Sequence, residues 1–150
     1  MSAPAPSASA AVPAHFQTFL AFDFGLRRTG VAFGTRMLGT ASPRPTIQAE
    51  GDARFAPVAR AIAEWQPDAL VVGLPFNMDD TEADPAPKMR RFANQLKARF
   101  GLPVHHADER LTSIESRRQL GIKTKGRVPG LDAYAAKLIL ETWLSEHPHL

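Results

Sequence analysis

Apolar residues near the start of the chain form short continuous runs separated by turn residues. Residues 18–24 and 30–34 are two such runs, and Gly25 and Thr29 bound the connection between them. Apolar runs of this length are typical of strands that are buried on both faces. The short connection predicts an antiparallel hairpin. Residues 40–46 predict a third strand, which its two prolines restrict to the edge of a sheet.

The spacing of apolar residues changes after Arg54. Phe55, Val58, Ile62 and Trp65 recur every three or four residues, which predicts an amphipathic helix that ends at Pro67. The same reading along the chain predicts strands at 68–75 and 103–107, and helices at 88–100, 113–120 and 131–145. Strands that alternate with helices favour right-handed crossovers. The sequence therefore predicts an α/β fold, a mixed sheet with helices on both faces.

Residues 1–17 are dominated by Ala, Pro and Ser and have neither a helical nor an alternating pattern. This composition predicts a disordered tail, followed by one domain at 18–150. The chain has no Cys, which excludes disulfides and thiolate ligands. We expect a cytoplasmic protein, because the chain has no signal-peptide pattern and no apolar run long enough for a membrane span.

Asp23 lies at the end of the first apolar run, where an ionised carboxylate is costly unless it is paired, hydrogen-bonded or bound to a cation. It is either a metal ligand or a residue that opens the turn at Gly25. Taken alone, the sequence around Asp23 favours neither interpretation.

Two further carboxylates could join Asp23. Glu109 follows a strand, at the edge where sheets with crossover helices bind ligands; the alternative is a solvated turn. Asp132 shares a helical stripe with Ala136, Ile139 and Trp143, so it should point toward the sheet, although Asp is also a favoured helix cap. If the three converge, their oxygens suit Mg²⁺ or Mn²⁺ and metal-assisted phosphodiester cleavage.

Positive charge is concentrated just before Asp132. Five basic residues and no acid lie within eleven positions, namely Arg117, Arg118, Lys123, Lys125 and Arg127. Such a segment could hold a nucleic-acid backbone without reading its sequence, and Arg27 and Arg28 could extend the track. The alternative is an ordinary solvated linker.

Four segments together resemble the signature blocks of the YqgF, or RuvX, family. They are DFGLRRTGVA from Asp23, VGLPFNMD from Val72, DERLTS from Asp108 and DAYAAKLIL from Asp132. The resemblance implies an RNase H-like fold with a mixed five-stranded sheet, related to the RuvC resolvases. It also implies a cytoplasmic nuclease of the small-subunit (16S) rRNA precursor, in which Asp23, Glu109 and Asp132 are the catalytic and metal-binding acids.

Other functions remain open from the sequence. The nucleic-acid partner could be structured RNA, ribosomal precursor particles or branched DNA such as a Holliday junction. A ribosome assembly factor with a weak or inactive site would keep the same residues. An ATP-binding protein of the actin and sugar-kinase type is a further alternative, but its fold needs two such domains and the usual phosphate-loop motifs are missing. The oligomeric state, monomer or homodimer, is also open.

Overall fold

The computed structural model describes residues 12–74, 86–108 and 131–148. The N-terminal half contains β1 (Thr18–Phe24), β2 (Thr29–Thr35), β3 (Thr40–Ile47), the short 3₁₀ helix η1 (Gly51–Arg54) and α1 (Phe55–Trp65). The C-terminal half contains β4 (Ala69–Leu74), α2 (Ala86–Phe100), β5 (Val104–Asp108) and α4 (Leu131–Glu146). Apart from η1, which was not predicted, these elements match the predicted ones in order and type. The predicted helix at 113–120 lies outside the described residues.

The strands form one mixed five-stranded sheet in the order β3-β2-β1-β4-β5. The first three strands pair antiparallel, whereas β4 lies parallel to both β1 and β5. The proline-containing strand β3 lies at the edge, where its missing amide donors cost least. The predicted mixed sheet is therefore confirmed.

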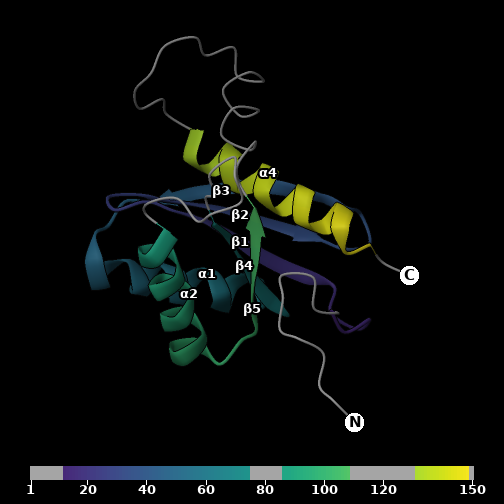
Figure 1. Ribbon diagram of the computed structural model, residues 1–150, viewed down its shortest axis with the longest axis horizontal. Coiled ribbons are helices and arrows are strands. Elements are labelled where there is room, and N and C mark those ends of the chain that lie inside the picture. The colour runs from purple at the N-terminus through teal and green to yellow at the C-terminus, as the bar shows by residue number, and fades with distance from the viewer. Residues whose placement is uncertain (1–11, 75–85, 109–130, 149–150) are drawn as a thin grey trace.

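Helices cover both faces of this sheet, as the sequence predicted (Figure 1). On one face, Phe19 and Ala21 of β1 pack with Ala136, Ile139 and Trp143 of α4. On the other face, a second cluster joins β1 to α1 and α2; it includes Leu20, Phe22, Phe55, Val58, Phe92 and Leu96. Because successive strand residues point to opposite faces, the continuous apolar run in β1 supplies both clusters. Burial of each large side chain contributes roughly 1.5–3 kcal/mol.

The N-terminal boundary of the domain differs from the predicted one at residue 17. Val12 is buried in the α4-side cluster. The guanidinium of Arg36 donates hydrogen bonds to the backbone carbonyls of Pro13 and Phe16, at 2.8 and 3.1 Å. Local composition alone did not predict this contact, because its donor lies twenty or more residues away. Residues 1–11, the rest of the predicted tail, are outside the described part.

Candidate metal and nucleic-acid site

Asp23 lies on the α4 side of the sheet. Phe19 and Ala21 face α4, and alternation along β1 gives Asp23 the same orientation. In the antiparallel ladder Asp23 is the partner of Gly30, so a Cβ atom at position 30 would point to the same face of the sheet as the Asp23 side chain. The Asp23 side chain is half-buried and has interactions within the protein.

Asp132 lies in the first turn of α4, directly over Gly30. A Cβ atom on Gly30 would overlap the backbone carbonyl of Asp132, so the helix approaches the strand backbone more closely than any other residue would permit. Ala136, Ile139 and Trp143 of the same stripe are buried, as the helical phase predicted. Gly30 is thus the cross-strand neighbour of Asp23 and also lies against the backbone of Asp132.

Asp132 forms an ion pair with the turn between β1 and β2. The Nε of Arg28 lies 3.5 Å from Oδ2 of Asp132, and about a third of each side chain is exposed. Arg27, its neighbour, is exposed. Of the two arginines in this turn that the sequence assigned to nucleic-acid binding, Arg28 therefore contacts a proposed metal ligand and Arg27 is exposed to solvent.

Arg54 holds the backbone of that turn in place. It is 4% exposed, and its guanidinium donates to the carbonyls of Gly25 and Leu26, both at 3.1 Å. A third bond to the carbonyl of Gly51 is 3.0 Å long, and the guanidinium lies 4.3 Å from the centre of the Phe24 ring. Burial lowers the pKa of Arg54, an effect that nearby Asp52 and Glu50 oppose. This buried cation fixes the two residues that follow Asp23 and Phe24.

The C-terminal ends of the parallel strands lie at the same edge of the sheet. Asp108, the last residue of β5, is in register with Leu74 of β4, which itself pairs with β1. Glu109 follows Asp108 in the sequence but lies outside the described residues. So does the basic segment, with Arg117, Arg118, Lys123, Lys125 and Arg127. The described part contains no group of three His, Asp or Glu side chains arranged to hold a metal.

His105 lies in β5, on the α4 side of the sheet, three residues before the end of the strand at Asp108. Its ring centroid is 5.2 Å from that of Trp143, which in turn lies 4.4 Å from His147. Burial is the largest cause that lowers the pKa of His105, and the neighbouring His147, His106 and Arg36 act in the same direction. His105 is half-buried, and its ring packs against the indole of Trp143, which is a structural contact.

The sequence analysis did not single out Gly30 or Arg54. For Gly30 a signal existed, because a glycine inside a strand indicates a bulge or the close approach of another backbone. For Arg54 no local signal was available, since its partners Gly25 and Leu26 are almost thirty residues away. Long-range pairing of a buried arginine with turn carbonyls is visible only in three dimensions.

No helix in the described ranges is long and apolar enough to cross a membrane.

The chain is similar to bacterial proteins that carry the name "Putative pre-16S rRNA nuclease". The protein of Albidiferax ferrireducens is 53% identical over 89% of this chain and 81% of its own length. That of Dechloromonas aromatica is 49% identical over 88% of this chain and 92% of its own length.

A solved structure supports the fold. The Thermus thermophilus RuvC structure matches with a TM-score of 0.50 at 16% identity, over 85% of this chain and 95% of that one, so the likeness concerns the RNase H-like fold alone. The family model described as "RuvX: Holliday junction resolvase" matches residues 17–146. The chain therefore belongs to the RuvX family.

Proposed function

We propose that this protein is a metal-dependent endonuclease that cleaves phosphodiester bonds in structured nucleic acid, with the small-subunit (16S) rRNA precursor as its substrate. The observation that carries the proposal is that Gly30, the ladder partner of Asp23, lies against the backbone of Asp132, near the end of β1 where the parallel strands also end. Membership of the RuvX family supports nuclease chemistry, and the names of the similar bacterial proteins support the choice of substrate.

The donor atoms at this edge fit Mg²⁺ or Mn²⁺. Asp23 and Asp132 offer hard carboxylate oxygens, which these ions prefer, and both side chains are only partly buried, so water can reach them. Arg28 beside Asp132 indicates that the site already attracts positive charge. We infer that Asp23, Asp132 and Glu109 hold the metal. A bound divalent ion would polarise the phosphoryl oxygen and acidify a water molecule.

Basic residues of the chain would hold the substrate. Arg27 is exposed in the turn between β1 and β2 and can contact a phosphate. We assign the same role to the other basic residues of the predicted track, Arg28, Arg117, Arg118, Lys123, Lys125 and Arg127. Contacts of this kind bind the backbone without reading sequence. Substrate choice would then depend on the shape of the nucleic acid. The protein would act in the cytoplasm, on ribosomal precursor particles.

A second candidate substrate is the Holliday junction. It is favoured by the description of the family model that matches residues 17–146. Symmetric cleavage of a junction would suit a homodimer, whereas cleavage of an rRNA precursor needs only a monomer. The two substrates can therefore be separated by cleavage assays on a four-way DNA junction and on precursor rRNA, together with the oligomeric state measured by light scattering.

The deciding experiment compares the wild-type protein with Asp23→Asn in both assays, with Mn²⁺ and with EDTA. We expect Asp23→Asn to keep its fold and its nucleic-acid binding but to lose Mn²⁺-dependent cleavage, because an amide replaces an anionic ligand. Glu64→Gln is the matched control, since it removes one negative charge from an exposed position of α1, away from both carboxylates. Full activity of Asp23→Asn would refute the proposed site. Binding without cleavage by the wild-type protein would instead favour an assembly factor.

A further inference from the structure

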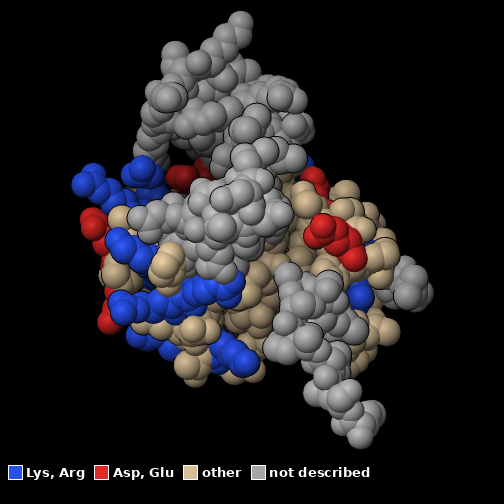
Figure 2. All heavy atoms as spheres, in the orientation of Figure 1, with Lys and Arg blue, Asp and Glu red and all other residues tan. Residues whose placement is uncertain are grey.

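All the charged side chains of helix α2 are positive. Its residues 86–100 include Lys88, Arg90, Arg91, Lys97 and Arg99 and no acid. Figure 2 shows Lys and Arg side chains gathered over the side of the molecule that α1 and α2 form. A helix surface with this composition attracts polyanions and is not explained by the carboxylate site, which lies on the opposite face of the sheet.

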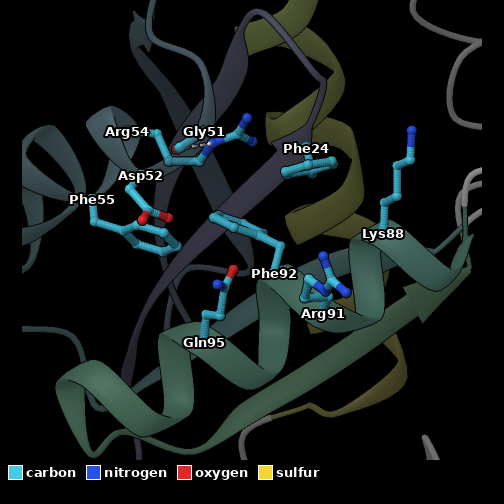
Figure 3. A pocket seen from close by; sticks show the side chains of 9 residues that line it. All are labelled: Phe24, Gly51, Asp52, Arg54, Phe55, Lys88, Arg91, Phe92 and Gln95. Carbon is cyan, nitrogen blue, oxygen red and sulfur yellow. Dashed lines mark hydrogen bonds between the residues drawn. The ribbon is translucent and has the colours of Figure 1, made fainter.

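A pocket opens between the N-terminal half of α2 and the segment around Arg54. Lys88, Arg91 and Gln95 line it from α2, with Phe24, Arg54 and Phe55 opposite (Figure 3). Spacings of three and four residues place the three α2 side chains on one stripe of the helix. The pocket therefore has an aromatic floor and a rim of polar donors.

Two cations on this rim lack a counter-charge. Within the described ranges, Lys88 and Arg91 have neither a hydrogen bond nor an ion pair, and both side chains are exposed. Asp52 also lines the pocket, but it lies 3.9 Å from Arg99 and is 83% exposed. Arg54 adds a third positive charge below the rim, although its donors are bound to carbonyls. The pocket is therefore electropositive and suited to an anionic group.

The position of the pocket connects it with the carboxylates. Phe24 lies in its floor and is the residue directly after Asp23, with its side chain on the opposite face of β1. Lys88 and Arg91 occupy the first two turns of α2, near the ends of the parallel strands. Lys97 is in the last turn of α2, close to where the chain enters β5. It is therefore near the opposite, N-terminal ends of the parallel strands.

We propose that the pocket of Lys88, Arg91 and Gln95 binds a backbone phosphate of the same nucleic acid that is cleaved at Asp23 and Asp132. This inference rests on the proposed function, which supplies the class of ligand. It adds a second contact with the nucleic acid, on the face of the sheet that α1 and α2 cover. Lys88 and Arg91 supply charge and Gln95 an amide donor, which is the chemistry that recognises phosphate without recognising a base. A strand held there would cross the edge of the sheet close to the carboxylates.

The test measures binding apart from cleavage. A fluorescein-labelled RNA hairpin is titrated with protein in EDTA at several salt concentrations, and a labelled four-way DNA junction is titrated in parallel. The double variant Lys88→Ala/Arg91→Ala is compared with Lys97→Ala/Arg60→Ala, which removes the same charge from exposed positions outside the pocket. Thermal unfolding of each variant checks that the fold is kept.

We expect the pocket variant to bind about tenfold more weakly than the wild-type protein at moderate salt. The slope of the logarithm of affinity against the logarithm of salt should fall by roughly 1.5 to 2, about one contact for each lost cation. The control variant should change both quantities much less. Equal effects in the two variants, or no binding of either probe by the wild-type protein, would overturn the inference.

Cleavage measured with Mn²⁺ separates this inference from the proposed function. If the wild-type protein does not cleave but the pocket variant alone loses binding, the pocket stands and the nuclease proposal fails. If the wild-type protein cleaves and the pocket variant binds and cleaves equally well, the nuclease proposal stands and the pocket fails.

Discussion

The guanidinium of Arg28, in the turn that follows the strand of Asp23, lies 3.5 Å from the carboxylate of Asp132 in α4. A partly exposed ion pair of this kind contributes about 0–1 kcal/mol, so a divalent cation can displace it. Arg28 is thus a built-in competitor for the proposed metal.

We predict that Arg28→Ala binds Mn²⁺ several-fold more tightly than the wild-type protein, up to about fivefold, because removing the pair frees at most about 1 kcal/mol for the metal. Calorimetric titration without nucleic acid measures this directly. Arg27→Ala is the control, since Arg27 is adjacent, exposed and carries the same charge. Identical affinities in the two variants would show that the ion pair does not compete with the metal.

Gly30→Ala should separate the two carboxylates. The added methyl group would overlap the carbonyl of Asp132, so the first turn of α4 must move, at a cost of about 3 kcal/mol. Urea unfolding gives the stability, and Mn²⁺ titration tests whether the metal site is lost with it. Gly39→Ala provides the contrast: Gly39 has a φ of +69° and no atom close to the new methyl group, so it should cost only about 1–2 kcal/mol. Equal losses at the two positions would contradict the close approach of α4 to β2.

Arg54→Met should loosen the turn between β1 and β2. Methionine keeps much of the apolar contact with Phe24 but leaves the carbonyls of Gly25, Leu26 and Gly51 without their donor. We expect a loss of about 2–4 kcal/mol, measured by urea unfolding. Hydrogen exchange of the turn amides should rise in the same variant. Arg60→Met, at an exposed position of α1, should leave both measurements unchanged.

Stability should fall as the pH decreases from 7 toward 5. The pKa of His105 is lowered from its ordinary value near 6.5, first by burial and then by neighbouring positive charge. The unfolded chain therefore binds more protons than the folded chain between the lowered pKa and about 6.5, and stability is lost as the pH falls through that window. The pKa of His147 is lowered as well, mainly by burial, and acts in the same sense.

Thermal unfolding of His105→Gln between pH 5 and 8 tests this origin. The variant should have a flatter dependence of melting temperature on pH than the wild-type protein, since one titrating group has been removed. His15→Gln, at an exposed position, should keep the wild-type dependence. An unchanged slope in His105→Gln would assign the acid sensitivity to other groups.

The sequence predicted the fold closely because its signals were local. Strand β1, for instance, is a continuous apolar run, and it matches the predicted residues 18–24. The helical phase of α4 likewise predicted that Ala136, Ile139 and Trp143 are buried. These patterns depend on periodicity, which a chain carries in its own residues.

The site was predictable only in part, because its geometry depends on pairs of distant residues. The position of Asp132 over Gly30 and the ion pair with Arg28 require β2 and α4 to meet across a hundred residues of sequence. Arg54 reaches Gly25 and Leu26 in the same way. Glu109 and the basic segment at 117–127 lie outside the described residues, so their assignment stays a prediction.

Within the described residues, the helix that covers one whole face of the sheet is also the last element of the chain. Phe19, Ala21, Ala32 and Val71 are all made before residue 131, yet they are buried by α4. During synthesis from the N-terminus, the five strands that α4 contacts therefore expose an apolar surface until this helix is made. A nascent chain that stalls before α4 is consequently an aggregation-prone sheet with one bare apolar side.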